Sequence, residues 1–167
     1  SGAKQMGSSG EYLSYEKTLK NPITSQNQTE FAIPAQITNP LSIAGGRDNF
    51  VVVYQNGSAD SFGRTSSGPC VTPPEATNLT KVVAKWNNII GLSAQGDIVL
   101  WPNNSFVNQL PNNLPKAKDV SVGGYVGFII SEADQVVSIG NLTAPAPSSI
   151  GTVKAIACGW ESAHVIK

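Results

Sequence analysis

Charge of either sign is scarce in this sequence. Charged residues make up 13% of the 167-residue chain, and its 11 Lys and Arg are balanced by 11 Asp and Glu. Nucleic acids and anionic membranes attract proteins through a field of one sign, so this balance argues against both as partners. No apolar run approaches the roughly 18–20 residues of a membrane span, and a signal-peptide pattern is missing from the start. We therefore expect the chain to be soluble as given.

Groups that could be activated for catalysis or metal binding are also few. The chain holds one histidine, His164, and two cysteines, Cys70 and Cys158, and these three residues do not stand at metal-ligand spacing. We expect no metal, no cofactor and no catalytic residue, and we expect His164 to be a structural histidine bonded inside the fold. The cysteines either pair in an oxidising compartment or stay free, with Cys158 buried in a strand.

The sequence has few residues that favour helices and many that favour turns. The sequence contains 16 Gly and 11 Pro, many Ser, Thr and Asn, and a single Met. This composition favours an all-β fold with many turns. The length suits one domain, so we expect a flexible N-terminus at residues 1–8 followed by a single domain at 9–167.

An internal repeat organises that domain. Three segments align, at residues 42–63, 82–103 and 119–141, and each combines apolar strands with a polar turn. The turn residues Gly57, Gly96 and Asp134 lie 39 and 38 positions apart. A residue with positive φ between two apolar strands favours a tight hairpin, so each segment predicts a hairpin unit.

A fourth copy is divided between the two ends of the chain. Residues 154–167 match the first half of the unit, and residues 8–15 match the second half. We therefore expect a small β-propeller of about four repeats, whose last blade is closed by the N- and C-terminal halves. The alternative is a piece of a longer array of repeats.

The repeat resembles that of the regulator of chromosome condensation family. The residues that carry the resemblance are Val153–His164 for the first half of the unit, Asp119–Tyr125 for the same half in another copy, and Ala94–Trp101 for the second half. The resemblance implies a β-propeller with antiparallel blades. The best-known member is a nucleotide exchange factor on a small GTPase, but this chain shows no counterpart of its charged loops or basic tail. Similar repeats occur in surface and adhesin-like proteins of bacterial or viral type, which suits the low charge better.

Two groups of residues that resemble reactive sites have simpler explanations. The Gly-rich steps Ala44–Gly46 and Val122–Gly127 are not followed by the Lys and Ser/Thr of a phosphate loop and recur at the repeat period, so we expect packing glycines. Four aspartates lie mostly at turns, where Asp favours the backbone geometry, namely Asp48, Asp60, Asp97 and Asp134. A glycosidase pair among them is the minor alternative.

The residues after each Gly step are the candidate ligand-binding site. In the aligned copies they are Arg47, Asn87, Tyr125 and Trp160, which a closed ring would place around one mouth of its channel. Aromatic and amide groups suit a sugar or a protein loop. The alternative is that Tyr125 and Trp160 fill space between blades. The connections 16–40, 64–80 and 102–118 form a second candidate surface.

Together these features predict a non-catalytic extracellular or surface module that binds a glycan or a cell-surface protein, as in adhesion, receptor binding or host attachment. Glycosylation sequons begin at five asparagines and fit an extracellular setting, namely Asn27, Asn56, Asn78, Asn103 and Asn141. A structural or assembly domain of a larger particle or fibre is the alternative. An intracellular regulator of the exchange-factor type is the third.

Overall fold

The structure is a computed structural model, and it describes residues 4–6, 12–14, 37–47, 49–63, 71–101, 110, 113–140, 150–160 and 162–167. The chain divides into two compact units, Ser1–Thr38 and Asn39–Lys167. In the first unit, strands β1 (Lys4–Met6) and β2 (Tyr12–Ser14) form a two-stranded antiparallel sheet. No helix of the described residues is long and apolar enough to cross a membrane.

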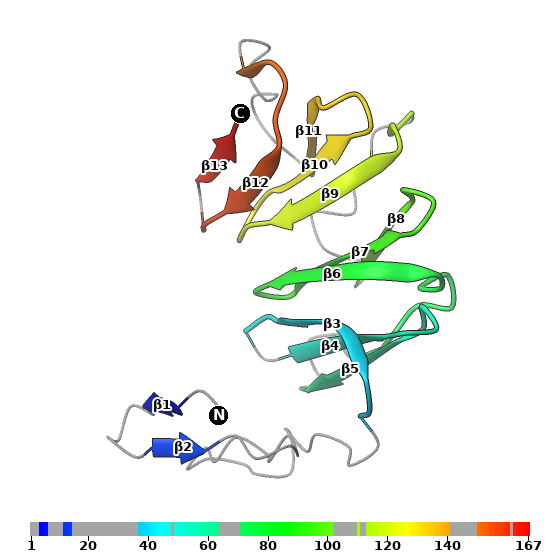
Figure 1. Cartoon of the computed structure of the whole chain (residues 1–167), viewed down its shortest axis with the longest axis vertical. Coiled ribbons are helices and arrows are strands. Elements are labelled where there is room, and N and C mark those ends of the chain that lie inside the picture. Colours follow the sequence, from blue (N-terminus) through cyan, green and yellow to red (C-terminus); the bar gives the residue numbers. More distant parts are fainter. Residues whose placement is uncertain are drawn as a thin grey trace. The chain divides into compact units, whose positions relative to one another are not determined.

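The second unit is a series of small antiparallel sheets that follow one another along the chain (Figure 1). The first sheet contains β3 (Pro40–Gly45), β4 (Asn49–Tyr54) and β5 (Ala59–Gly63). The second contains β6 (Leu79–Lys85), β7 (Asn88–Ser93) and β8 (Ile98–Trp101). The third contains β9 (Ala117–Val122), β10 (Gly127–Ser131) and β11 (Val136–Ile139), and the fourth contains β12 (Ala155–Cys158) and β13 (Ala163–Ile166). The predicted all-β repeat is confirmed.

The turns between the second and third strands are built as the repeat predicted. Gly57, Gly96 and Asp134 have φ values of 78°, 80° and 63°, in the left-handed region. These three turns also join neighbouring sheets, because each turn residue's carbonyl accepts a hydrogen bond from a residue at or just before the start of the next sheet. The donors are the backbone N–H groups of Leu79 at 2.9 Å, Ala117 at 2.9 Å and Val153 at 3.0 Å.

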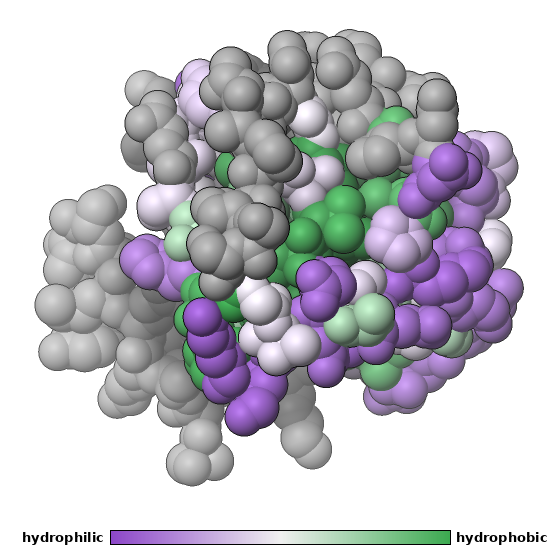
Figure 2. Space-filling view, turned by 90° about the horizontal axis from the view of Figure 1, so that it is seen from above, coloured by the Kyte–Doolittle hydropathy of each residue, from purple (hydrophilic) through white to green (hydrophobic). Residues whose placement is uncertain are grey.

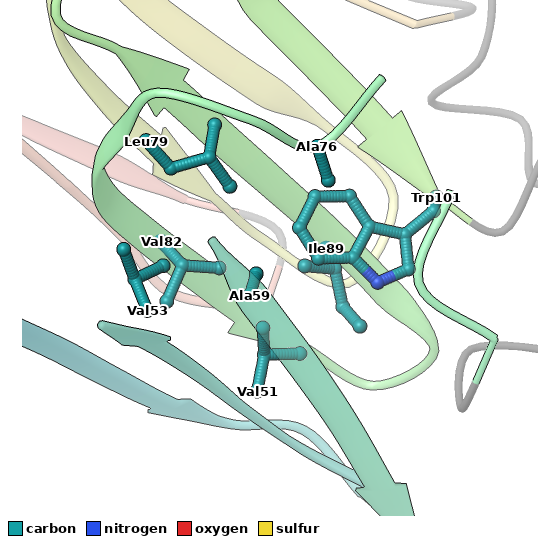
Figure 3. Packing of buried hydrophobic residues seen from close by; sticks show 8 residues of the cluster. All are labelled: Val51, Val53, Ala59, Ala76, Leu79, Val82, Ile89 and Trp101. Carbon is teal, nitrogen blue, oxygen red and sulfur yellow. The ribbon is translucent and has the colours of Figure 1, made fainter. Parts of the chain in front are cut away.

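Hydrophobic cores fill the spaces between the first three sheets. Between the first and second sheets, side chains from β4 and β5 meet side chains from β6, β7 and β8 (Figure 3); the buried residues there are Val51, Val53, Ala59, Ala76, Leu79, Val82, Ile89 and Trp101. The Trp101 indole N–H donates to Ser61 Oγ at 3.2 Å, so its one polar group is satisfied inside the core. A second core joins the second and third sheets and is centred on Ile90, Val120 and Ile129.

The aspartates predicted at turns are held in structural interactions. Asp97 pairs with Lys116 and Asp134 with Lys118. The Tyr54 hydroxyl donates to Asp60 at 2.9 Å. Asp48 lies outside the described residues. Burial raises the pKa of Tyr54, and the hydrogen bond to Asp60 and that residue's charge act in the same direction.

The strands at the two ends of the chain pair locally, and the predicted closure of a last blade by both ends stays a prediction. β2 pairs with β1, with Met6 opposite Tyr12, and β13 pairs with β12. A hairpin between strands separated by a few residues costs much less loop-closure entropy than pairing across the whole chain. Residues Lys4–Met6, placed in the segment expected to be flexible, therefore form a strand.

The fourth sheet holds two residues, His164 and Cys158, for which the sequence made predictions. His164 lies on β13, which among the described strands pairs only with β12, and its side chain is exposed. The expectation of a histidine bonded inside a blade is therefore wrong. Cys158 is a free thiol, partly buried at the end of β12. Cys70 lies outside the described residues.

Candidate functional site

The turns that join the first two strands of each sheet lie next to one another, on one side of the second unit. The backbone N–H of Arg47, in the β3–β4 turn, donates to the carbonyl of Trp86, in the β6–β7 turn, at 2.9 Å. The N–H of Gly124, in the β9–β10 turn, donates in the same way to the carbonyl of Trp160, in the β12–β13 turn, at 3.1 Å. Each of these turns is therefore tied to the turn of the following sheet.

Two asparagine side chains add equivalent bonds. The Asn49 Nδ2 group donates to the carbonyl of Trp86 at 3.0 Å, and the Asn88 Nδ2 group donates to the carbonyl of Gly124 at 3.1 Å. Both asparagines are buried, which makes these bonds costly to lose. Neither was singled out from the sequence, although both directly follow a turn and stand 39 positions apart.

The Gly steps let neighbouring turns approach closely. A Cβ on Gly46 would lie 2.2 Å from the Trp86 carbonyl oxygen, and a Cβ on Gly124 would lie 2.7 Å from the Trp160 ring. A Cβ on Gly123 would likewise lie 2.7 Å from the Gly159 carbonyl oxygen. The expectation that these are packing glycines is confirmed.

A cluster of one cation and three aromatic rings results from this arrangement, and we call it the turn cluster: Arg47, Trp86, Tyr125 and Trp160. The Arg47 guanidinium lies 4.5 Å from the centre of the Trp86 ring. Trp86 and Trp160 meet edge to face with their centres 4.8 Å apart, and Tyr125 meets Trp160 in the same way at 5.4 Å. Each of the four turns thus contributes one member.

The turn cluster is exposed as well as internally packed. Tyr125 is 57% exposed, Trp160 39% and Trp86 38%. Tyr125 and Trp160 therefore do more than fill space between sheets, although the Trp160 ring also covers Gly124. Exposed aromatic rings held by rigid backbone are typical of binding surfaces, because little entropy is lost when they bind.

The strand registers correct the alignment that defined the candidate site. Ile89 pairs with Ala84 as Phe50 pairs with Gly45, so Trp86, and not Asn87, is the counterpart of Arg47. By the same registers Gly124, and not Tyr125, is the counterpart of Trp160. The β6–β7 turn contains no glycine to mark the step, which shifted the sequence alignment by one residue.

Three of the four predicted residues, Arg47, Tyr125 and Trp160, nevertheless lie together. Asn87 does not join their ring contacts, and its Oδ1 atom is buried without a hydrogen-bond partner among the described residues. Of the second candidate surface, the structure describes only residues 37–40, 71–80, 110 and 113–118.

The side chains of the turn cluster are of types that make contacts with a ligand. The cluster offers a guanidinium, two indoles and a phenol, which stack, make cation–π contacts and donate hydrogen bonds. Nearby, Cys158 donates its backbone N–H to Ser121 Oγ at 3.0 Å, and burial raises the pKa of its thiol. In the part of the chain that the structure describes, no three His, Cys, Asp or Glu side chains group as metal ligands would.

The arrangement of sheets is similar to that of several solved structures. Human WBSCR16 aligns with a TM-score of 0.68 and 12% identity over 87% of this chain. Prp20p from Saccharomyces cerevisiae, the yeast RCC1, aligns with a TM-score of 0.65 and 13% identity over 94% of this chain. The ectodomain of the Physcomitrella patens receptor kinase CR4 aligns with a TM-score of 0.61 and 16% identity over 75% of it.

The fold is that of an RCC1-like β-propeller. The chain spans 51% of WBSCR16, 51% of Prp20p and 35% of the CR4 ectodomain. No family model and no curated protein sequence matches the chain. The resemblance to regulator of chromosome condensation repeats is thus supported at the level of fold.

Proposed function

We propose that this chain is a non-catalytic recognition module that binds a protein partner through the turn cluster. The observation that carries the proposal is the exposure of three aromatic rings and an arginine on turns that hydrogen bonds and close-packed glycines fix in place. Tryptophan, tyrosine and arginine are the residue types that most often dominate the energy of protein interfaces. Their turns are braced by the Arg47–Trp86 and Gly124–Trp160 backbone bonds.

The geometry of the rings favours a protein over a sugar. Sugars stack on a flat and open ring face. In both edge-to-face pairs one ring face is already in use, and Arg47 occupies a face of Trp86. An irregular surface of edges and a phenol group fits a protein segment better. Prp20p, which shares the fold, has described binding properties to Gsp1p and histones, which supports the general use of this fold in protein binding.

A glycan is the second candidate, because Tyr125 and Trp160 still present more than a third of their surfaces to solvent. Indole and phenol groups together provide the stacking and hydrogen bonding that sugar sites use. The same experiment can therefore compare both ligand classes.

The test is to select ligands for the purified chain from a displayed random-peptide library and, in parallel, from a glycan array. Selected ligands are then measured against Trp160→Ala and against Tyr54→Ala, an aromatic control whose hydroxyl bonds to Asp60 at the opposite end of β4. We expect a peptide whose affinity falls at least about tenfold in W160A and stays unchanged in Y54A, since hot-spot truncations cost about 2 kcal/mol or more. Ligands that bind W160A as well as the wild type would contradict the proposal, and glycans alone would favour the second candidate.

We also propose that the module works outside the cell. The two sequon asparagines that the structure describes, Asn56 and Asn78, are both exposed, and a receptor ectodomain shares the fold. Expression through a eukaryotic secretory pathway, followed by peptide mass spectrometry, should find glycan at one or both positions. Efficient secretion with both asparagines unmodified would count against this location.

A further inference from the structure

The interface between the first and second sheets and the interface between the second and third sheets use the same two sets of positions. At the interface between the first and second sheets, the second sheet contributes the first set of positions, namely Val82, Ile89 and Trp101. The first sheet contributes the second set, namely Ala44, Val51 and Val53. The strand registers place Val120 and Ile139 of the third sheet at positions of the first set, and Val83, Ile90 and Leu92 of the second sheet at positions of the second set. The repeat therefore defines one recurring interface with two complementary halves.

The first sheet presents one half of this interface to solvent. By register, Ile43, Phe50 and Phe62 stand where Val82, Ile89 and Trp101 stand in the second sheet, and we call them the head face. Ile43 is 52% exposed, whereas Val82 is 3% exposed. Residues of core type thus remain on the surface here.

The fourth sheet presents the other half. Ala157, His164 and Ile166 stand where Ala44, Val51 and Val53 stand in the first sheet, and we call them the tail face. Ile166 is 65% exposed, whereas Val53 is completely buried. Figure 2, viewed from the end where β12 and β13 lie in Figure 1, shows hydrophobic residues on the surface beside hydrophilic ones.

We propose that the head face of one copy of this chain binds the tail face of a second copy, forming a head-to-tail dimer. The partner is a second copy because one chain carries both halves of an interface that it already uses internally, and both halves are exposed. Such a heterologous contact forms a closed ring when its rotation allows it. A dimer with two head-to-tail contacts would leave neither apolar face exposed. This inference concerns a different surface from the turn cluster and does not depend on the proposed function.

One feature weakens this contact relative to the internal ones. Pro40 stands where Leu79, Ala117 and Val153 donate their backbone N–H to the preceding sheet, and proline has no N–H to donate. The head-to-tail contact therefore lacks a hydrogen bond that three internal junctions make. We expect a reversible dimer that dissociates on dilution.

The test is sedimentation velocity of the full chain over a wide concentration range, with one variant for each face. Ile43→Glu places a charge on the head face, Ile166→Glu on the tail face, and Thr77→Glu adds the same charge at an exposed position outside both. We expect the wild type and T77E to dimerise, and I43E and I166E each to stay monomeric. An equimolar mixture of I43E and I166E should recover dimers, held by the one contact in which the head face of I166E and the tail face of I43E are both unchanged.

Several outcomes would overturn the proposal. A wild-type chain that remains monomeric at all concentrations shows that the two faces do not bind each other between copies. Dimers that persist in both variants show that another surface is used, and two variants that fail to recover dimers on mixing show a symmetric contact. Circular dichroism of each variant verifies its fold, and Ile43→Ser and Ile166→Ser provide milder replacements if a glutamate prevents folding.

Discussion

Replacing Gly46 by alanine should separate the role of close turn packing from that of the strands. The new Cβ would lie 2.2 Å from the Trp86 carbonyl oxygen, a backbone atom that cannot rotate away. Relief requires the β3–β4 and β6–β7 turns to move apart, which weakens the bonds that Arg47 N–H and Asn49 Nδ2 donate to that oxygen. Overpacking costs about 1–3 kcal/mol, and each weakened hydrogen bond costs about 1 kcal/mol.

We therefore expect G46A to lose about 3 kcal/mol of stability, which lowers Tm by roughly 6–12 °C for a domain of this size. Gly45→Ala is the matched control, because its Cβ would meet only the flexible Phe50 ring, at 3.3 Å. Thermal unfolding followed by circular dichroism, with urea titration for the free energy, measures both variants. If G46A melts within about 2 °C of G45A, the close approach of these two turns is not a feature of the folded protein.

Three other predictions follow from contacts in the same unit. Asn88→Ala should lose about 1–3 kcal/mol of unfolding free energy by urea titration, because it leaves the Gly124 carbonyl without its donor, whereas the exposed Asn56→Ala should lose less than about 1 kcal/mol. Leu79→Ala should lose about 2–5 kcal/mol in the same assay because it empties part of the first core; a loss below about 1 kcal/mol would contradict that burial. Burial favours the protonated thiol of Cys158, so its rate of alkylation by iodoacetamide should rise with a midpoint above the ordinary thiol pKa of 9.0, and a midpoint below that value would show an activated thiol.

The sequence predicts the parts of the fold that local chemistry controls. The turn residues Gly57, Gly96 and Asp134 could be identified because few residue types adopt a left-handed conformation in a tight turn between apolar strands. Their regular spacing in the sequence agreed with the repeat period. The packing role of Gly46 and Gly124 followed from the same period. These features depend on residues close together in the chain.

Features that depend on contacts between residues far apart in the sequence were harder to predict. The pairing of β2 with β1 was not predicted, because residues 4–6 belong to none of the aligned repeat segments. Trp86 was missed because its turn has no glycine to mark it in the sequence. The turn is defined only by the pairing of Lys85 with Asn88, which the sequence does not show. The exposure of Ile43 and Ile166 depends on which sheets meet, and the residue types there indicate burial.

The turns of successive sheets meet and bring their aromatic side chains together in one exposed cluster. Nuclear Overhauser effects between assigned ring protons test this most directly, because the ring centres of Trp86 and Trp160 lie 4.8 Å apart and those of Tyr125 and Trp160 lie 5.4 Å apart. We expect cross-peaks for both pairs in the wild type, and loss of the Trp86–Trp160 cross-peak in G124A, whose new Cβ would displace the Trp160 ring. A wild-type spectrum with cross-peaks within each sheet but none between these rings would contradict the account.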